Sequence, residues 1–217
     1  MQLYKYPSFF MVGLFILLAF TSCTKEESII EVVPTQLTAA EFLALHVSQD
    51  ILFQYSYDNP TIGVSNGWLI DKKGEVKTYE LSSINNSSDI TDKGSCTRTD
   101  LLNLYAYSKP NGTSIEAEEL VAKYKQISDA SYGILSTNQS GSEKEGTSTF
   151  YAIQYDSNGE TYTSNTGCGN NCGNGTTKSP FARIILQQSG TNNRYNQSTA
   201  ATGLVQWLSN IHETVVH

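Results

Sequence analysis

The sequence of 217 residues has little of the chemistry from which most active sites and nucleic-acid surfaces are built. It contains three histidines and only two methionines, and both Met1 and Met11 lie close to the start of the chain. Lysine and arginine total 14 against 21 acidic residues, and nowhere do they form a cluster. Because phosphate contacts and anionic lipid both require clustered basic side chains, this balance argues against nucleic-acid binding and electrostatic membrane docking.

Catalytic motifs are also absent. The chain has no Gly-x-Ser-x-Gly, no His-Glu-x-x-His and no phosphate-binding loop. His46 lies on the face of an expected helix, His217 is the last residue printed, and His212 falls near a helix end, where a cation complements the dipole. The sequence therefore assigns no catalytic residue, metal ligand or cofactor, and a non-enzymatic role is favoured.

Long apolar runs are missing too, except for one near the start. Residues 9–20 form a twelve-residue apolar stretch, preceded by Lys5 and followed at once by Thr21 and Ser22. A bilayer-spanning helix needs about 20 apolar residues, so this run is too short. A basic start, a short apolar core and small residues at its end are typical of a secretory signal peptide.

The residues Phe20-Thr21-Ser22-Cys23 resemble the lipobox of bacterial lipoproteins, in the form found in Bacteroidota, with Phe20 where leucine is most common. The resemblance implies cleavage before Cys23, a diacylglycerol on its sulfur and usually an N-acyl chain such as palmitate. Lys25-Glu26-Glu27 resembles the surface-export signal of the same group, and a solvated tether is the alternative. The implied location is the outer membrane or cell surface, lipid-anchored, with a periplasm-facing position as the alternative.

This interpretation divides the chain into a signal peptide at 1–22, a tether at 23–36 and one domain at 37–217. The mature chain would have 195 residues with 13 basic and 21 acidic side chains, a net charge of −8. That length suits a single domain with a sizeable core. Membrane attachment would depend on lipid at Cys23, because two or more acyl chains anchor stably at about 0.8 kcal/mol per buried methylene.

Hydrophobic periodicity and turn signals predict the elements of the domain. The expected helices open at a capping box of Thr38 and Glu41, near Thr99 or Asp100, at a second box of Thr113 and Glu116, and at Ser198 or Thr199. The expected strands cover 51–57, 67–70, 75–81, 150–155, 160–163 and 181–186. Their order predicts an α+β fold, an antiparallel sheet of about five or six strands with helices packed on one face.

Two turns share the pattern Asp-x-x-Gly-Glu, one beginning at Asp71 and the other at Asp156. Each would join a hairpin, strand 67–70 with 75–81 and strand 150–155 with 160–163. A duplicated unit would explain the match, but Asp-x-x-Gly is a common turn solution and one matched turn is weak support for a repeat.

The cysteines other than Cys23 are Cys96, Cys168 and Cys172. Cysteines outside the cytoplasm tend to pair, and the near pair Cys168–Cys172 is the favoured disulfide, while pairing of Cys96 with either remains open. The spacing of Cys168 and Cys172 differs from the two-residue gap of thioredoxin-like and zinc sites, so no metal is assigned there.

Aromatic side chains offer the clearest binding surface in the sequence. Tyr55 and Tyr57 alternate with polar residues in the expected strand 51–57, and Trp68 lies on the next strand. Such rings can form a sugar-stacking platform, and the alternative is an ordinary sheet face beneath helices.

The sequence thus favours a lipid-anchored envelope protein that acts as a non-enzymatic binding or interaction module for a glycan, peptide or partner protein. One alternative is a thiol-dependent hydrolase using Cys96 or Cys168 with His46 or His212. Another is an inhibitor or immunity-like protein that binds a single partner.

Overall fold

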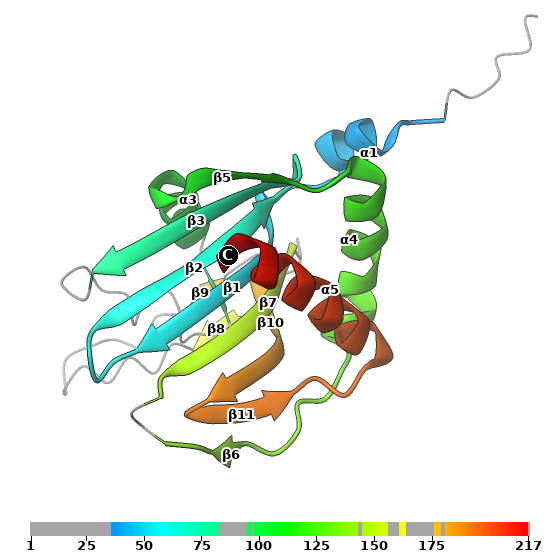
Figure 1. The fold of residues 1–217 in the computed structure, drawn as a ribbon. Helices are drawn as coiled ribbons and strands as arrows, with labels where there is room; N and C mark the ends of the chain where they lie inside the picture. The colour runs from blue at the N-terminus through cyan, green and yellow to red at the C-terminus, as the bar shows by residue number, and fades with distance from the viewer. Residues whose placement is uncertain are drawn as a thin grey trace, which may run out of the picture. The chain divides into compact units, whose positions relative to one another are not determined.

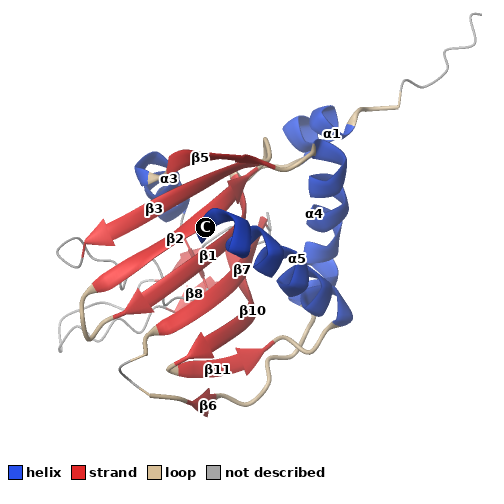
Figure 2. Ribbon diagram, viewed as in Figure 1, coloured by secondary structure: helices blue, strands red, loops and turns tan. Residues whose placement is uncertain are grey.

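The computed structural model describes residues 36–82, 95–96, 98–142, 145–155, 161–163, 176–178 and 181–216. Leu37–His217 cluster as one compact unit. The unit is α+β, with an antiparallel sheet and helices that lie across and beside it (Figures 1 and 2). Cys23, Cys168, Cys172 and the second Asp-x-x-Gly turn lie outside the described residues.

The sheet is larger than the five or six strands predicted. Eight strands follow in the order β5-β3-β2-β1-β7-β10-β11-β6, and β4 pairs with β10. The strands are β1 (Ile51–Asn59), β2 (Val64–Asp71), β3 (Glu75–Ser82), β4 (Ser95–Cys96), β5 (Lys109–Ser114), β6 (Gln139–Ser140), β7 (Thr147–Tyr155), β10 (Phe181–Gly190) and β11 (Asn192–Tyr195). The missed strands are short and polar, so they lack the apolar alternation from which strands are predicted.

The described helices are α1 (Ala39–His46), α3 (Arg98–Tyr107), α4 (Ala117–Ser131) and α5 (Thr199–Val216). The predicted capping box opens α1: the Glu41 amide donates to Thr38 Oγ1 at 3.3 Å, and the Thr38 amide donates to Glu41 Oε2 at 2.8 Å. Ser198 caps α5 by accepting from the Ala201 amide at 3.1 Å. Both helix starts were predicted because their signals lie within four residues of each other.

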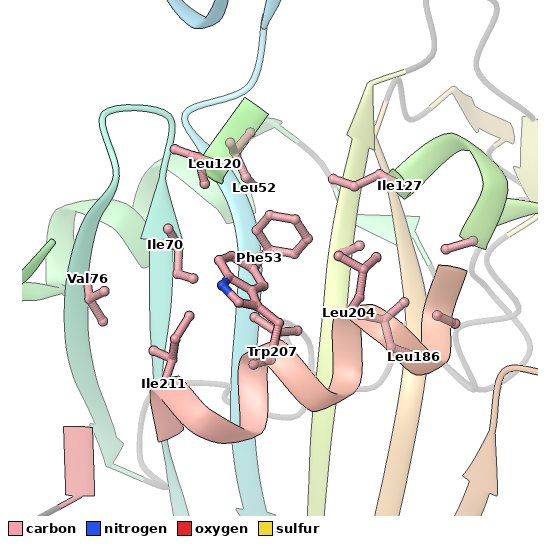
Figure 3. Close-up of a cluster of buried hydrophobic side chains, with 14 of the residues drawn as sticks. Leu52, Phe53, Ile70, Val76, Leu120, Ile127, Leu186, Leu204, Trp207 and Ile211 are labelled. Carbon is pink, nitrogen blue, oxygen red and sulfur yellow. The ribbon is translucent and has the colours of Figure 1, made fainter. Parts of the chain in front are cut away.

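Two clusters of buried side chains form the core. Trp68 and Ile70 belong to the larger cluster, which includes residues of α1, α4 and α5 (Figure 3). Leu69 lies between them on β2 and belongs to the second cluster, with Leu101 and Leu104 of α3. Because successive strand residues point to opposite faces, the clusters lie on opposite sides of the sheet. The prediction that the helices pack on one face is therefore not confirmed.

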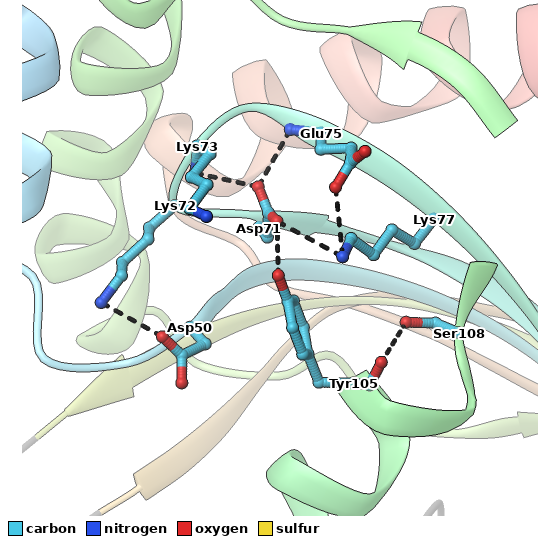
Figure 4. A network of polar contacts seen from close by, with 8 residues as sticks. All are labelled: Asp50, Asp71, Lys72, Lys73, Glu75, Lys77, Tyr105 and Ser108. Carbon is cyan, nitrogen blue, oxygen red and sulfur yellow. Dashed lines mark hydrogen bonds and ion pairs between the residues drawn. The ribbon is translucent and has the colours of Figure 1, made fainter. Parts of the chain in front are cut away.

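Asp71 organises the turn between β2 and β3. Its side chain is 1% exposed, and Oδ1 accepts from the amides of Lys73 and Glu75 at 2.9 Å each (Figure 4). Oδ2 accepts from the Tyr105 hydroxyl at 2.9 Å and lies 3.9 Å from Lys77 Nζ. Gly74 follows with φ of 85°, a conformation that favours glycine, so the Asp-x-x-Gly pattern correctly predicts this turn.

The second predicted capping box is wrong. Thr113 lies in β5, which pairs with β3, and α4 begins at Ala117 with Glu116 as an N-cap that makes no side-chain hydrogen bond. The Ile115 amide donates to the Gly74 carbonyl at 2.8 Å. This hydrogen bond holds the residue after β5 in place beside the β2–β3 turn. Pairing with a distant segment overrides the local helix signal here.

The predicted hairpin of 150–155 with 160–163 is also wrong. β7 pairs with β1 and β10, whereas β8 (Thr161–Thr163) pairs with β9 (Thr176–Lys178) in a separate small sheet. The first Asp-x-x-Gly turn does join two paired neighbours, β2 and β3. The duplicated unit therefore has no support in the strand pairing of the described residues.

Candidate functional site

A groove of about 1100 Å³ lies over the face of β1, β2 and β3. One row of its floor runs across the strands, since Tyr55 is opposite Trp68, Trp68 opposite Thr78, and Thr78 opposite Lys109 of β5. Directly opposed residues of antiparallel strands share a face, so register alone brings these side chains together. All of them line the groove.

A second row lies two residues further along the same strands. Tyr57 is opposite Asn66, Asn66 is opposite Glu80, and Tyr57 is opposite Ser148 of β7. These four also line the groove, with Tyr107 from the end of α3. The floor therefore combines aromatic rings with an amide, hydroxyls, a carboxylate and an ammonium group.

The last turns of α5 provide a wall through His212, Val215 and Val216. Leu208 and Ile211 are buried in the larger core cluster, which holds the helix against the sheet. The next residue along the helix is His212, whose ring centroid lies 4.2 Å from that of Tyr55.

His212 accepts a hydrogen bond from Trp68: indole Nε1 donates to Nδ1 at 3.1 Å. Burial lowers the pKa of His212, opposed by the nearby charge of Glu213. The neutral imidazole is thus favoured, and with Nδ1 accepting, its proton is assigned to Nε2. A proton on Nδ1 would face the N–H donor of the Trp68 indole and break this hydrogen bond. The neutral form of His212 therefore positions Trp68.

The three aromatics predicted to face a ligand all reach the groove, but they differ in exposure. Trp68 is 2% exposed and stacks on Tyr55 with ring centroids 5.8 Å apart, so it offers no free face. Tyr55 is half-buried, and its hydroxyl shares a 3.1 Å hydrogen bond with Ser148 Oγ. Burial is the main cause that raises the pKa of Tyr55, so the phenol stays protonated.

Tyr57 and Tyr107 are better placed to meet a ligand. The Tyr57 hydroxyl donates to the Glu145 carbonyl at 2.9 Å and accepts from Asn59 Nδ2 at 3.2 Å, which fixes a half-exposed ring. Tyr107 is 65% exposed. These rings flank a polar floor, as in sites that recognise ligands bearing many hydroxyl groups.

Several groove residues were not predicted from the sequence. Asn66 and Glu80 lie two residues from Trp68 and Thr78, so period-2 alternation could have found them once strand register was known. Tyr107 and Lys109 reach the groove only because β5 pairs with β3, a contact for which the sequence carries no local signal.

Of the proposed hydrolase residues, the structure describes the backbone of Cys96 and both histidines, whereas Cys168 lies outside the described residues. Cys96 lies in β4 opposite Phe181, a member of the second core cluster, whereas His212 contacts Trp68 and Tyr55 over the other face. His46 is exposed on α1 with its ring 5.1 Å from that of Phe42.

A search of the described residues finds no group of three or more His, Cys, Asp or Glu side chains arranged to hold a metal ion. None of the helices described is both long and apolar enough to cross a bilayer.

No protein-family model, no curated protein and no solved structure matches the chain. Functional conclusions therefore depend on the residues and geometry of the site alone.

Proposed function

We propose that this chain is a lipid-anchored lipoprotein of the cell envelope whose domain is a non-enzymatic binding module, and that the groove over β1–β3 binds a glycan. The observation that carries the proposal is the floor of the groove. Two cross-strand rows and Tyr107 place aromatic rings beside hydrogen-bonding groups of several kinds.

The composition of the groove favours a polyhydroxylated ligand. The amide of Asn66 and the carboxylate of Glu80 are planar groups that can each contact two neighbouring hydroxyls. The ring faces of Tyr57 and Tyr107 offer apolar surface to the C–H face of a sugar. A single carboxylate and a single ammonium, from Glu80 and Lys109, line the groove, so a largely uncharged ligand is favoured.

A peptide is a poorer fit because strand addition needs a free sheet edge. The groove lies over β1, β2 and β3, each of which is paired with neighbours on both sides. The backbone groups of β1 and β2 along the groove are therefore engaged within the sheet, while β3 pairs with β5 only between Glu75 and Thr78, so recognition falls mainly to side chains.

The hydrogen bond made by His212 favours binding over thiol-dependent hydrolysis. A general base needs a free nitrogen lone pair, and the lone pair of His212 Nδ1 is occupied by the Trp68 indole. The imidazole thus supports the groove rather than serving as a base.

Anchoring through Cys23 is tested separately. Replacing Cys23 with alanine should leave the protein unprocessed or release it from the membrane, because the lipid is the proposed attachment. Fractionation of cells producing each form measures this. A Cys23→Ala protein that is processed and still partitions with membranes would contradict the lipoprotein proposal. Protease accessibility on intact cells then separates the surface location from the periplasm-facing one.

Glycan binding by the groove is tested by screening the purified domain on a glycan array and measuring the affinity of the best ligand. Tyr107→Ala and Asn66→Ala should each weaken binding about tenfold, through loss of a ring contact or of a bidentate hydrogen bond. Tyr132→Ala is the matched control, because Tyr132 is 84% exposed and does not line the groove.

The array and the variants can each contradict the proposal. If no glycan binds, or if Tyr132→Ala weakens binding as much as Tyr107→Ala, the groove is not a glycan site. Capture of one tight protein partner whose binding depends on Tyr107 would instead favour an inhibitor or immunity-like protein.

A further inference from the structure

A second pocket lies near the other end of the strand order, where β10 and β11 pair. Its volume is about 440 Å³, and its lining consists of four glutamines, one asparagine, three serine or threonine residues, Tyr195 and Arg194. Among the described residues that line it, none is acidic or aliphatic, although the chain as a whole carries a net charge of −7. A lone arginine among carboxamides and hydroxyls gives this pocket a positive potential.

The register of the sheet fixes the guanidinium of Arg194. Arg194 is directly opposite Gln188 in the β10–β11 ladder, and its Nε donates to Gln188 Oε1. Gln188 is 8% exposed, and its Nε2 donates in turn to Thr149 Oγ1 at 3.1 Å. The buried amide of Gln188, hydrogen-bonded at both its oxygen and its nitrogen, thus holds Arg194 through Nε. The two terminal guanidinium nitrogens, which can form a bidentate pair with a ligand, are not used in this contact.

The two terminal nitrogens of Arg194 remain available for a ligand. Across residues 36–82, 98–142, 145–155 and 181–216, the hydrogen bond from Nε is the only polar contact of this side chain, and no carboxylate pairs with it. A guanidinium fork in this state matches the two oxygens of a carboxylate. Because the fork is already oriented, less side-chain entropy is lost on binding.

We propose that this pocket binds a carboxylate-bearing sugar, with Arg194 on the carboxylate and the surrounding amides and hydroxyls on the ring substituents. The side chains of Gln139 and Gln197 supply donors and acceptors for hydroxyl groups.

Other anionic ligands fit the pocket less well. A peptide C-terminus would bring an apolar or varied side chain, and no aliphatic residue is among the described residues that line the pocket. A phosphate or nucleotide carries about two negative charges, and a single arginine neutralises only one of them. A singly charged, hydroxyl-rich molecule matches both the charge and the polarity of the lining.

The test is a titration of the domain with D-glucuronate, D-glucose and acetate, followed by NMR shifts of backbone amides in β10 and β11. Glucuronate should bind saturably. Glucose, which lacks the carboxylate, and acetate, which lacks the sugar ring, should each bind at least about tenfold more weakly. Arg194→Gln should weaken glucuronate binding about tenfold or more. Arg194→Lys should also lose most of the affinity, because it keeps the charge but not the fork.

The matched control is Lys73→Gln, which also removes one positive charge but is exposed in the β2–β3 turn and lines neither the groove nor this pocket. It should leave glucuronate binding unchanged. The proposal is overturned if glucuronate does not saturate, if acetate or glucose binds equally well, or if Arg194→Gln retains full affinity. Thermal unfolding of each variant checks that the fold is intact.

This pocket stands independently of the glycan groove. Tyr107→Ala should not affect glucuronate binding, and Arg194→Gln should not affect the ligand of the groove. Failure at one site can therefore be told apart from failure at the other.

Discussion

Replacing Asp71 with alanine is expected to lower the free energy of unfolding by about 3–5 kcal/mol, the range for breaking a buried, hydrogen-bonded charge pair. The substitution removes the acceptor for two backbone amides of the β2–β3 turn and for the hydroxyl of Tyr105 on α3 (Figure 4). It also removes the buried carboxylate 3.9 Å from Lys77 Nζ, which keeps only its ion pair with the more exposed Glu75 at 3.1 Å. Urea denaturation, with a check that the m-value is unchanged, measures the loss.

The chain offers a matched control for this prediction. Asp50 makes an ion pair with Lys72 at 3.1 Å, but the two side chains are 43% and 27% exposed. Asp50→Ala should therefore cost no more than about 1 kcal/mol. Tyr105→Phe, which removes one hydrogen bond from the network, should cost about 1 kcal/mol. If Asp71→Ala costs no more than Asp50→Ala, the turn is not held by the carboxylate.

Replacing Arg183 with methionine is expected to raise the free energy of unfolding by about 1–4 kcal/mol, as found when buried charged groups give way to apolar side chains. Arg183 lies on β10 and is 4% exposed, and no nitrogen of its guanidinium has a hydrogen-bond partner among the residues described. Its contact there is the ring of Tyr151, 5.6 Å from the guanidinium carbon. Methionine keeps the length and flexibility of the side chain without the cost of burying a charge.

The control for Arg183 is a substitution that keeps the charge. Arg183→Lys should give no increase in stability, because an ammonium group is at least as costly to bury as a guanidinium. Urea denaturation of both variants at one pH and one salt concentration provides the comparison. A loss of stability in Arg183→Met would contradict the prediction.

The parts of the fold that were predicted correctly depend on short-range chemistry. The box of Thr38 and Glu41, the cap at Ser198 and the turn from Asp71 to Gly74 each bring their contacts together within four residues. Such signals can be recognised in the sequence because the interacting groups are close together along the chain. The same rule explains the failure at Thr113, where the pairing of β5 with β3 is a long-range contact.

In the candidate site, too, features set by short-range patterns were predicted and features set by long-range contacts were not. Alternation in β1 correctly places Tyr55 and Tyr57 on one face, and both line the groove. The register of β2 and β3, which adds Asn66 and Glu80, is set by pairing that periodicity does not encode. The covering of Trp68 by His212 depends on how α5 crosses the sheet, so the low exposure of this indole could not be predicted.

The two outermost strands of the sheet bear on how the domain behaves when many copies are held close together. β6 has only two residues, and β5 contains Pro110, which has no backbone N–H to donate, beside the exposed Lys109. Short edges, proline and lysine all hinder the addition of a strand from another molecule. Copies of the domain held close together would therefore resist edge-to-edge aggregation, because neither outermost strand favours pairing with a strand of another molecule.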